Sequence, residues 1–168
     1  EDMLKDCLTP YSVSKTAGEE LCKVYYNIYG LETVILRYFN VYGNREPVKG
    51  HYAPVVGLFL RQKKEGQPLT VVGDGQQTRD FTHIDDAVDA NILSATTKNK
   101  AAFGEVFNIG TGENHSILRV AHLVGGEIKY IEPRSGEARD TLADNSKARK
   151  ILGWKPTKNL ENYIKNLT

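Results

Sequence analysis

The sequence predicts an α/β fold with a buried parallel sheet, and two neighbouring segments carry this prediction. Residues 10–29 have apolar side chains at helical spacing, and Gly30 follows them. Residues 33–36 (TVIL) are then apolar or β-branched without alternating polar positions, which is typical of a strand buried on both faces of a parallel sheet. An amphipathic helix followed directly by such a strand indicates the α/β class.

The composition is that of an ordinary globular chain. Its 168 residues include 22 Lys+Arg and 21 Asp+Glu, a net charge of +1, and 40% are hydrophobic. This balance offers no basic surface for nucleic acid. The longest apolar run, residues 55–60, is too short to cross a bilayer, and the acidic amino terminus is unlike a signal peptide. We therefore expect a soluble, cytoplasmic protein that binds neither nucleic acid nor membrane.

The cysteines and histidines form no metal or redox motif. Cys7 and Cys22 lack C-x-x-C spacing, and the four histidines are scattered. Zinc and redox sites require such residues at short, regular spacing. We expect both cysteines to be free thiols and the chain to hold no metal.

The first helix has signals at both ends. Thr9 can cap its amino end, Pro10 suits its first position, and Gly30 can adopt the left-handed conformation that ends a helix. The spacing therefore predicts a helix over residues 10–29. Its apolar face comprises Leu21, Val24, Tyr25 and Ile28.

The later elements are marked by capping residues and short apolar runs. Pro54 opens a helix, Asp85-Asp86 suit the positive amino end of a helix dipole, and Ser116 can cap a third helix. Gly153 can end the last helix. The predicted elements are helices over residues 54–65, 85–96, 117–124 and 147–152, and strands over residues 69–72, 81–84 and 106–109.

Tyr11 and Lys15 are the first candidate functional pair. Their i, i+4 spacing places the phenol and the ammonium on one face of the first helix. A nearby cation favours the ionised form of a phenol, and such a pair can take a proton from a hydroxyl group. An ordinary amphipathic helix explains the pair equally well, because a chain with nine tyrosines contains such pairs by chance.

Further candidates follow the first predicted strand, follow a glycine turn, or lie beside a later glycine. Asn40 comes just after that strand, where open α/β sheets bind ligands, although it could instead cap its own turn. Arg79 follows the turn Gly73-Asp74-Gly75, and Arg134 lies close to Glu137. Two guanidinium groups can bind a diphosphate, and a carboxylate can accept hydrogen bonds from a ribose. Taken singly, each arginine is more often a surface or ion-pair residue.

The order of these motifs resembles one known family. The sequence is similar to the extended short-chain dehydrogenase/reductases, and within them to the NAD-dependent nucleotide-sugar epimerase/dehydratase branch, of which UDP-glucose 4-epimerase is the familiar member. The resemblance spans nearly the whole chain. Its motifs, in order, are PYxxSK at 10–15, RYFNVYG at 37–43, GDG and RDF within 73–81, FNIG at 107–110, RxGE at 134–137 and LGW at 152–154.

The resemblance implies a domain organisation. The chain would be the carboxyl-terminal part of a Rossmann-like doubly wound sheet, joined to a small mixed α/β substrate-binding domain. Residues 1–43 would end the dinucleotide-binding domain, and residues 44–168 would form mainly the substrate domain. Residues 85–112 would pack back on the Rossmann-like part.

The resemblance also implies roles for residues near the cofactor, NAD. Tyr11 would be the catalytic base and would contact NAD. Lys15 would favour the phenolate and hold the nicotinamide ribose. Tyr38 and Phe39 would line the nicotinamide side of the cleft, and Asn40 would contact the phosphates of the substrate.

The remaining implied contacts bind the substrate, a nucleotide sugar and most simply a UDP-sugar. Arg79 and Arg134 would clamp the diphosphate, so both should share a cavity with the tyrosine. Glu137 would bind the nucleotide ribose, and Leu69 and Val72 would lie along the base.

The implied reaction is 4-epimerisation of a UDP-hexose. The phenolate takes the C4 hydroxyl proton as hydride leaves C4 for NAD, and the resulting 4-keto sugar is reduced on its other face. Two alternatives stay open: a nucleotide-sugar 4,6-dehydratase or decarboxylase, and, in another class, a non-catalytic nucleotide-sugar-binding fragment.

The 168 residues lack the glycine-rich turn that seats the cofactor pyrophosphate in this family. We therefore expect a part of a longer enzyme that is inactive alone and binds NAD poorly. We also expect homodimerisation or aggregation through the open edge of the first strand, near Val34 and Leu36.

Overall fold

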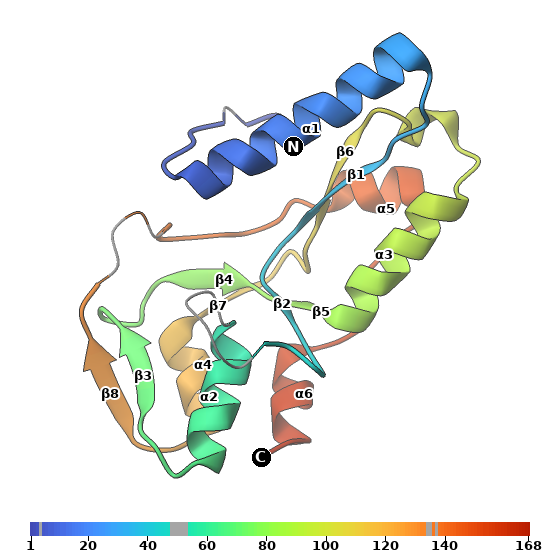
Figure 1. The fold of residues 1–168 in the computed structure, drawn as a ribbon. Helices are drawn as coiled ribbons and strands as arrows, with labels where there is room; N and C mark the ends of the chain where they lie inside the picture. The colour runs from blue at the N-terminus through green and yellow to red at the C-terminus, as the bar shows by residue number, and fades with distance from the viewer. Residues whose placement is uncertain (4, 48–53, 134–135, 137) are drawn as a thin grey trace.

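The computed structural model describes residues 1–3, 5–47, 54–133, 136 and 138–168. Figure 1 shows the order of the elements along this part of the chain. The helices are α1 (Pro10–Tyr29), α2 (Val55–Lys64), α3 (Ile84–Thr96), the 3-10 helix η1 (Lys100–Ala102), α4 (Ile117–Val124), α5 (Ser146–Leu152) and α6 (Leu160–Lys165). The strands are β1 (Ile35–Tyr38), β2 (Val41–Tyr42), β3 (Leu69–Val72), β4 (Thr78–Asp80), β5 (Thr82–His83), β6 (Val106–Ile109), β7 (Asn114–Ser116) and β8 (Ile128–Ile131).

The strands of the described residues form pairs that are mostly parallel. β1 pairs with β6, β2 with β5, and β3 with β8, all in parallel, whereas β4 pairs with β7 in antiparallel fashion. Each parallel partner is distant in sequence, with a helix in the intervening segment. The predicted α/β class is confirmed, and the pairs represent part of a Rossmann-type fold.

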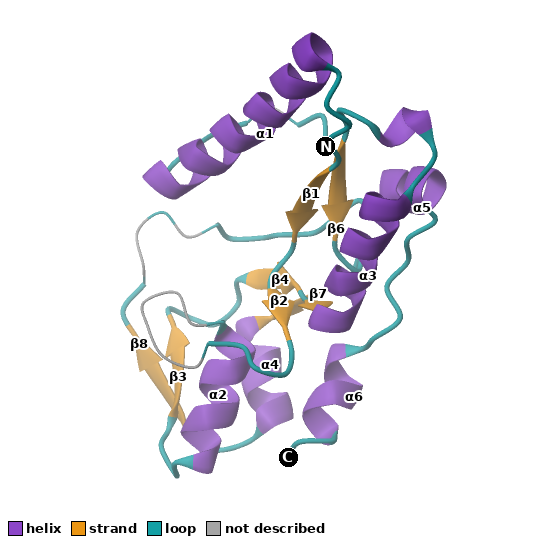
Figure 2. Ribbon diagram, turned by 45° about the vertical axis from the view of Figure 1, so that its right-hand side comes forward, coloured by secondary structure: helices purple, strands orange, loops and turns teal. Residues whose placement is uncertain are grey.

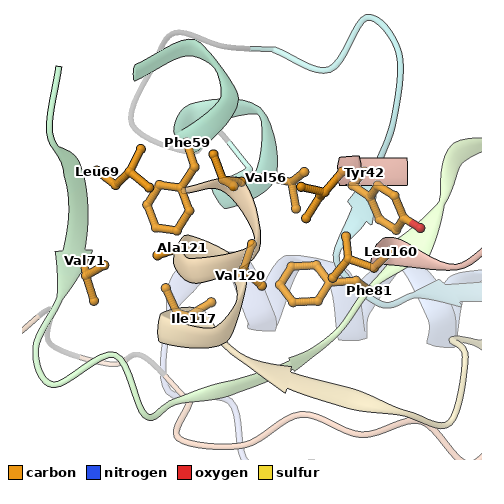
Figure 3. Packing of buried hydrophobic residues seen from close by; sticks show 12 residues of the cluster. Tyr42, Val56, Phe59, Leu69, Val71, Phe81, Ile117, Val120, Ala121 and Leu160 are labelled. Atoms are coloured by element: carbon orange, nitrogen blue, oxygen red, sulfur yellow. The ribbon is translucent and has the colours of Figure 1, made fainter. Parts of the chain in front are cut away.

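The main core lies at the end of the molecule that holds α2, α4, β3 and β8. Figure 3 shows Phe59 of α2 packed between α4 and β3, with Tyr42 and Phe81 beside Leu160 of α6. A second core joins β6, α3 and α5. Its buried members are Ala90, Ala102, Phe107, Ile109, Ala148, Leu152 and Trp154.

The other end of the molecule holds α1, β1 and β6, and it is more open (Figure 2). The sequence predicted a first strand buried on both faces, but within β1 only Ile35 is buried. No residue of α1 is buried. Within the described residues β6 is the one strand paired with β1, so the second edge of β1 has no strand partner among them.

Some predicted elements have different bounds. The strand expected over residues 81–84 is present but shorter: β5 is Thr82–His83, Ile84 begins α3, and a separate strand, β4, ends at Asp80. These two strands separate because β4 pairs with β7 while β5 pairs with β2. The sequence analysis did not predict β2, β4, β7, β8, η1 or α6.

The segment expected to pack back on the first part of the chain includes α3 and β6. β6 pairs with β1 along Ile35–Tyr38, and α3 contacts β1 as well. The boundary between the two proposed domains stays a prediction. No helix in the described part of the chain is long and apolar enough to span a membrane.

Candidate active site

The first turn of α1 carries the predicted base. Thr9 Oγ1 accepts a hydrogen bond from the Ser12 N–H at 3.2 Å, and Ser12 Oγ accepts one from the Thr9 N–H at 3.1 Å. This reciprocal cap satisfies two free donors of the helix end and fixes the turn. Tyr11 lies in this turn, and the residue is 64% exposed. Lys15 Nζ lies 5.2 Å from the centroid of the Tyr11 ring, so the predicted pairing on one helix face is confirmed.

A cavity of about 640 Å³ lies beside this pair, between α1, the segment before it and β1. We call it the tyrosine cavity. Tyr11, Lys15 and Tyr38, three of the residues expected at the cofactor, all line it. Phe39, the fourth, lies against the end of β6, because an ideal Cβ on Gly110 would be 3.1 Å from its Cγ.

One ion pair joins α1 to β1 at this cavity. Arg37 Nε and Nη2 donate to the two carboxylate oxygens of Glu19 at 2.6 and 2.7 Å. Hydrogen bonds from Arg37 lower the pKa of Glu19 to about 2, with a further contribution from Lys5. Because α1 buries no residue, this bidentate pair is a main connection between the helix and the sheet.

A second cavity of about 680 Å³ lies at the carboxyl ends of β3 and β8. We call it the strand-end cavity. Parallel strands end at the same edge, which is where open α/β sheets bind ligands. Val72, predicted to contact the nucleotide base, lines it. The other lining residues are Gly73, Asp74, Gln77, Tyr130, Ile131, Glu132, Pro133, Ala138 and Arg139.

Leu69 does not have the predicted position beside a ligand. It has no exposed surface and packs in the main core. Side chains alternate between the two faces of a strand, so Leu69 and Val71 of β3 face the core while Thr70 and Val72 face outward. Treating residues 69–72 as one ligand-facing run ignored this alternation.

The predicted diphosphate clamp is only partly visible. Arg134 and Glu137 lie outside the described residues, although Pro133 and Ala138, which flank them, line the strand-end cavity. Arg79 is 9% exposed. Its Nη1 donates to the carbonyl oxygen of Thr78 at 2.7 Å and to that of Arg139 at 3.4 Å. Arg79 therefore binds backbone carbonyl groups beside the strand-end cavity. It does not line the tyrosine cavity, so the expectation that Arg79 shares that cavity with Tyr11 is not met. Its contact with a diphosphate stays a prediction.

Asn40 joins the end of β1 to β4. Its Nδ2 donates to the carbonyl oxygen of Asp80 at 3.0 Å and to Thr141 Oγ1 at 3.4 Å. Its φ of 27° lies in the left-handed region, which asparagine tolerates better than most residues. The amide thus connects segments of the chain, and its contact with substrate phosphates stays a prediction.

Asp80 ties the two ends of the molecule together. This fully buried carboxylate accepts hydrogen bonds from the N–H and the Oγ1 of Thr111, at 2.8 and 2.7 Å. It also accepts from the N–H groups of Gly112 and Ala143, at 2.9 and 3.1 Å. Thr111 and Gly112 follow β6, whereas Ala143 belongs to the segment returning from the strand-end cavity. The sequence analysis did not single out this aspartate.

The tyrosine cavity and the strand-end cavity have no lining residue in common. Gly136 nevertheless lies near the amino end of α1, because a Cβ placed on it would be 3.5 Å from Cγ2 of Thr9. Gly136 belongs to the predicted arginine motif, and Thr9 caps the turn that carries Tyr11. Gly136 therefore lies near the residue that caps α1.

Sequence reasoning also missed an ion pair in the strand-end cavity. Arg139 Nη1 and Nη2 donate to Oδ1 and Oδ2 of Asp74 at 3.0 and 3.2 Å. Asp74 was noted only as part of a glycine turn. Arg139 lies five positions after Arg134. This closeness in sequence to a predicted diphosphate-binding residue was the one signal that could have pointed to Arg139.

The parallel strand pairs, with helices in the segments between them, define an α/β protein that contains part of a Rossmann-type fold. Comparison with known families gives the finer assignment. Residues 2–110 match the NAD dependent epimerase/dehydratase family. The chain belongs to this family, which confirms the resemblance.

Three relatives illustrate the similarity. The UDP-glucose 4-epimerase of Mycolicibacterium smegmatis is 35% identical over 93% of this chain and 50% of its own length. The UDP-N-acetyl-alpha-D-glucosaminuronate decarboxylase of Bacillus cytotoxicus is 44% identical over 66% of this chain and 33% of its own. The structure of the Bacillus cereus UDP-glucuronic acid 4-epimerase, in complex with UDP-glucuronic acid and NAD, superposes with a TM-score of 0.85 at 39% identity, over 98% of this chain and 53% of the other.

The chain spans about half the length of the curated relatives it matches. Its structure therefore corresponds to part of the fold of those proteins. Among the described residues, no group of three or more His, Cys, Asp or Glu side chains is placed to hold a metal ion.

Proposed function

We propose that this chain supplies the catalytic tyrosine and the nucleotide-sugar site of an NAD-dependent UDP-hexose 4-epimerase. The proximity of Gly136 to Thr9 carries the proposal, because Gly136 lies in sequence between two lining residues of the strand-end cavity, Pro133 and Ala138, and Thr9 caps the turn that bears Tyr11. A substrate bound by its nucleotide in the strand-end cavity would extend its sugar toward the phenol.

Each residue of the Tyr–Lys pair has a separate task. Tyr11 takes the proton from the C4 hydroxyl of the sugar and later returns it. Lys15, whose Nζ lies 5.2 Å from the centroid of the Tyr11 ring, places a positive charge beside the group that exchanges the proton. The 64% exposure of Tyr11 leaves the phenol accessible to a substrate.

The residues present fit one end of NAD. The tyrosine cavity offers a phenol, an ammonium and the ring of Tyr38, a donor set suited to a ribose and a flat ring. When bound, NAD accepts a hydride from the sugar and returns it. The 168 residues contain no glycine-rich turn for the pyrophosphate, so the chain alone should bind NAD poorly and be inactive.

The strand-end cavity suits the nucleotide. Val72, Ile131 and Pro133 offer apolar contacts for a base, and Tyr130 adds an aromatic ring. Arg79, Arg134, Glu137 and Asn40 keep their proposed roles at the diphosphate and ribose. This mixture of apolar walls with a few polar groups is typical of small-molecule sites.

The substitution Tyr11→Phe tests the reaction when it is made in the longer protein that we expect the gene of the source organism to encode. We expect UDP-hexose epimerase activity in the purified protein to fall about 100-fold or more, because general base catalysis contributes that much. Tyr25→Phe on the same helix is the matched control and should leave activity unchanged. Equal activity in the Tyr11→Phe protein would overturn the catalytic proposal and favour a non-catalytic nucleotide-sugar-binding role.

The similarity to a decarboxylase favours one alternative. A nucleotide-sugar decarboxylase, like a 4,6-dehydratase, would use the same tyrosine on a similar substrate. Calorimetry of the chain with UDP-glucose and with UDP-glucuronate compares them. The UDP-hexose proposal expects UDP-glucose to bind at least as tightly, whereas a preference of more than about tenfold for the uronate would favour an enzyme of UDP-sugar acids, either a decarboxylase or a UDP-uronate 4-epimerase.

We also propose a homodimer that forms through the open edge of β1. Val34 and Leu36 are half-buried beside this edge and line a cavity against α3. An uncovered strand edge with apolar flanks favours pairing with another chain. Light scattering should show a dimer or larger species, and a monodisperse monomer would contradict the proposal. A cytoplasmic location likewise stays a prediction.

A further inference from the structure

We propose that Arg139 is an anion-binding residue of the strand-end cavity, and that Asp74 competes with the bound diphosphate for it. This inference rests on the proposed function, because it takes the ligand of the cavity to be a nucleoside diphosphate. Neither residue belonged to the clamp that the sequence analysis predicted.

Both residues line the strand-end cavity and face each other within it. Arg139 makes two parallel hydrogen bonds to Asp74, at 3.0 and 3.2 Å. A carboxylate and a phosphate offer the same kind of paired oxygens to a guanidinium group. Asp74 therefore occupies, in the free chain, the bonding positions that a phosphate would use.

The backbones on both sides of this pair are held in place. The carbonyl oxygen of Arg139 accepts from the Thr78 N–H at 2.9 Å, and Thr78 Oγ1 donates to Asp140 Oδ1 at 2.8 Å. Asp74 Oδ1 also accepts from the N–H of Gln76 at 2.9 Å and so fixes its own turn. An exchange of Asp74 for a phosphate group therefore requires a movement of the Arg139 side chain alone.

The ion pair is weak enough to exchange. The side chains of Arg139 and Asp74 are 61% and 58% exposed. Exposed pairs contribute little to stability, because water screens the charges and side-chain entropy is lost. An incoming diphosphate carries more negative charge than one carboxylate, so it can replace Asp74 as the partner of Arg139.

The charges around the strand-end cavity explain why Asp74 should weaken the binding of a diphosphate. The described lining residues include two carboxylates, Asp74 and Glu132, and one guanidinium group, that of Arg139. These side chains together repel an anionic ligand, and the Asp74–Arg139 pair also neutralises the one cation among them. Removing the charge of Asp74 should therefore strengthen binding of a diphosphate and leave binding of an uncharged nucleoside unchanged.

The test compares UDP with uridine by calorimetry of the 168-residue chain. Asp74→Asn keeps an oxygen for the Gln76 N–H but removes the charge. We expect it to bind UDP about three- to tenfold more tightly than the unchanged chain, with uridine affinity unaltered. Arg139→Gln should bind UDP about tenfold more weakly, again without change for uridine. In the double variant, Asp74→Asn should give a smaller gain than it does alone.

Glu161→Gln is the matched control. Glu161 pairs with Arg119 at an exposed position, and neither residue lines the strand-end cavity. This variant removes the same charge and should leave UDP affinity unchanged. If it strengthens UDP binding as much as Asp74→Asn, the effect is one of net charge and the inference is overturned.

Other outcomes separate the inference from the proposed function. If the unchanged chain binds neither UDP nor uridine, the nucleotide site itself is wrong. If it binds UDP but Asp74→Asn leaves the affinity unaltered or lowers it, only the competition is wrong. If Arg139→Gln weakens uridine as much as UDP, Arg139 has a structural role and does not bind the anion.

Discussion

The two ends of this molecule are stabilised in different ways. Around α2, α4 and β3, apolar side chains are enclosed by their neighbours, and Phe59, Val71 and Val120 have no exposed surface. On α1 no residue is buried, and Leu21 and Ile28 are 58% and 68% exposed. Burial of apolar surface holds the first end together, whereas ion pairs such as Arg37–Glu19 hold α1 to the sheet.

This difference separates the two halves of the proposed site. The strand-end cavity is built on the enclosed end, so its nucleotide contacts should be preformed. The tyrosine cavity is built on the open end, where the helix lacks a packed core. We expect nucleotide binding to survive in this chain and cofactor binding to depend on further covering structure.

Phe59→Ala should have the largest effect on stability. Truncating a buried phenylalanine costs about 3–5 kcal/mol of unfolding free energy, from lost burial and the cavity left behind. Leu21→Ala on α1 is the matched control and should cost less than about 0.5 kcal/mol, as exposed substitutions do. Urea unfolding measures both. Similar costs for the two variants would contradict the contrast between the ends.

Asp80→Asn should cost about 2–4 kcal/mol, because an amide cannot accept all the hydrogen bonds of a buried carboxylate. Asp86 is the matched control, since it is equally buried and accepts from Thr157 at 2.9 Å and Lys158 at 3.1 Å. Amide exchange should quicken at Ala143 in Asp80→Asn, and at Lys158 in Asp86→Asn. Identical exchange patterns would show that Asp80 does not join the two ends.

Glu46→Gln tests a buried carboxyl at the enclosed end. Glu46 accepts a hydrogen bond from the Gly57 N–H of α2, whose N-cap residue Pro54 provides no side-chain cap. Within the described residues its Oε2 is buried without a hydrogen-bond partner. This burial raises the pKa of Glu46 from 4.5 to about 7.

The sign of the pH effect follows from this shift. Between pH 4.5 and about 7 the folded chain binds a proton that the unfolded chain has released, so stability falls as pH rises through this range. Glu46→Gln should remove this fall and stabilise the chain above pH 7, by at most about 3 kcal/mol. Glu65→Gln, at the exposed end of α2, should leave the pH profile unchanged. Parallel profiles for Glu46→Gln and the unchanged chain would contradict the assignment.

Glu19→Gln should have the smallest effect, at the open end. The pKa of Glu19 is lowered from 4.5 to about 2, chiefly by hydrogen bonds from Arg37. Its stabilising contribution is therefore present above about pH 4.5 and is lost as pH falls toward 2. Because the pair is partly exposed, we expect a loss of about 1 kcal/mol at pH 7, measured by urea unfolding. A loss that persists unchanged at pH 2 would contradict this origin.

The sequence predicted elements whose ends are marked locally. Thr9 and Gly30 bound α1, and Ser116 caps α4, as their residue types indicate. It failed for β8 and β2, because such short strands are stabilised by partners far away in the chain. The split between β4 and β5 likewise depends on two different partners, and no local pattern reports that.

The candidate site was predictable in its residue types more than in its geometry. The spacing of Tyr11 and Lys15 gave their common face, because helix periodicity fixes it. The strand-end cavity requires β3 to pair with β8, so the Arg139–Asp74 contact could not be read from spacing. The side chain of Leu69 was assigned to the ligand because the alternation of side chains along β3 was overlooked. Asp80 was not singled out because its carboxylate accepts hydrogen bonds from residues far away in the chain.

Calorimetry of the 168-residue chain with UDP-glucose and, separately, with NAD tests the central claim most directly. The claim is that the enclosed end holds a complete nucleotide site while the open end holds only part of a cofactor site. We predict saturable binding of UDP-glucose and no measurable binding of NAD. Tight binding of NAD together with no binding of UDP-glucose would contradict it.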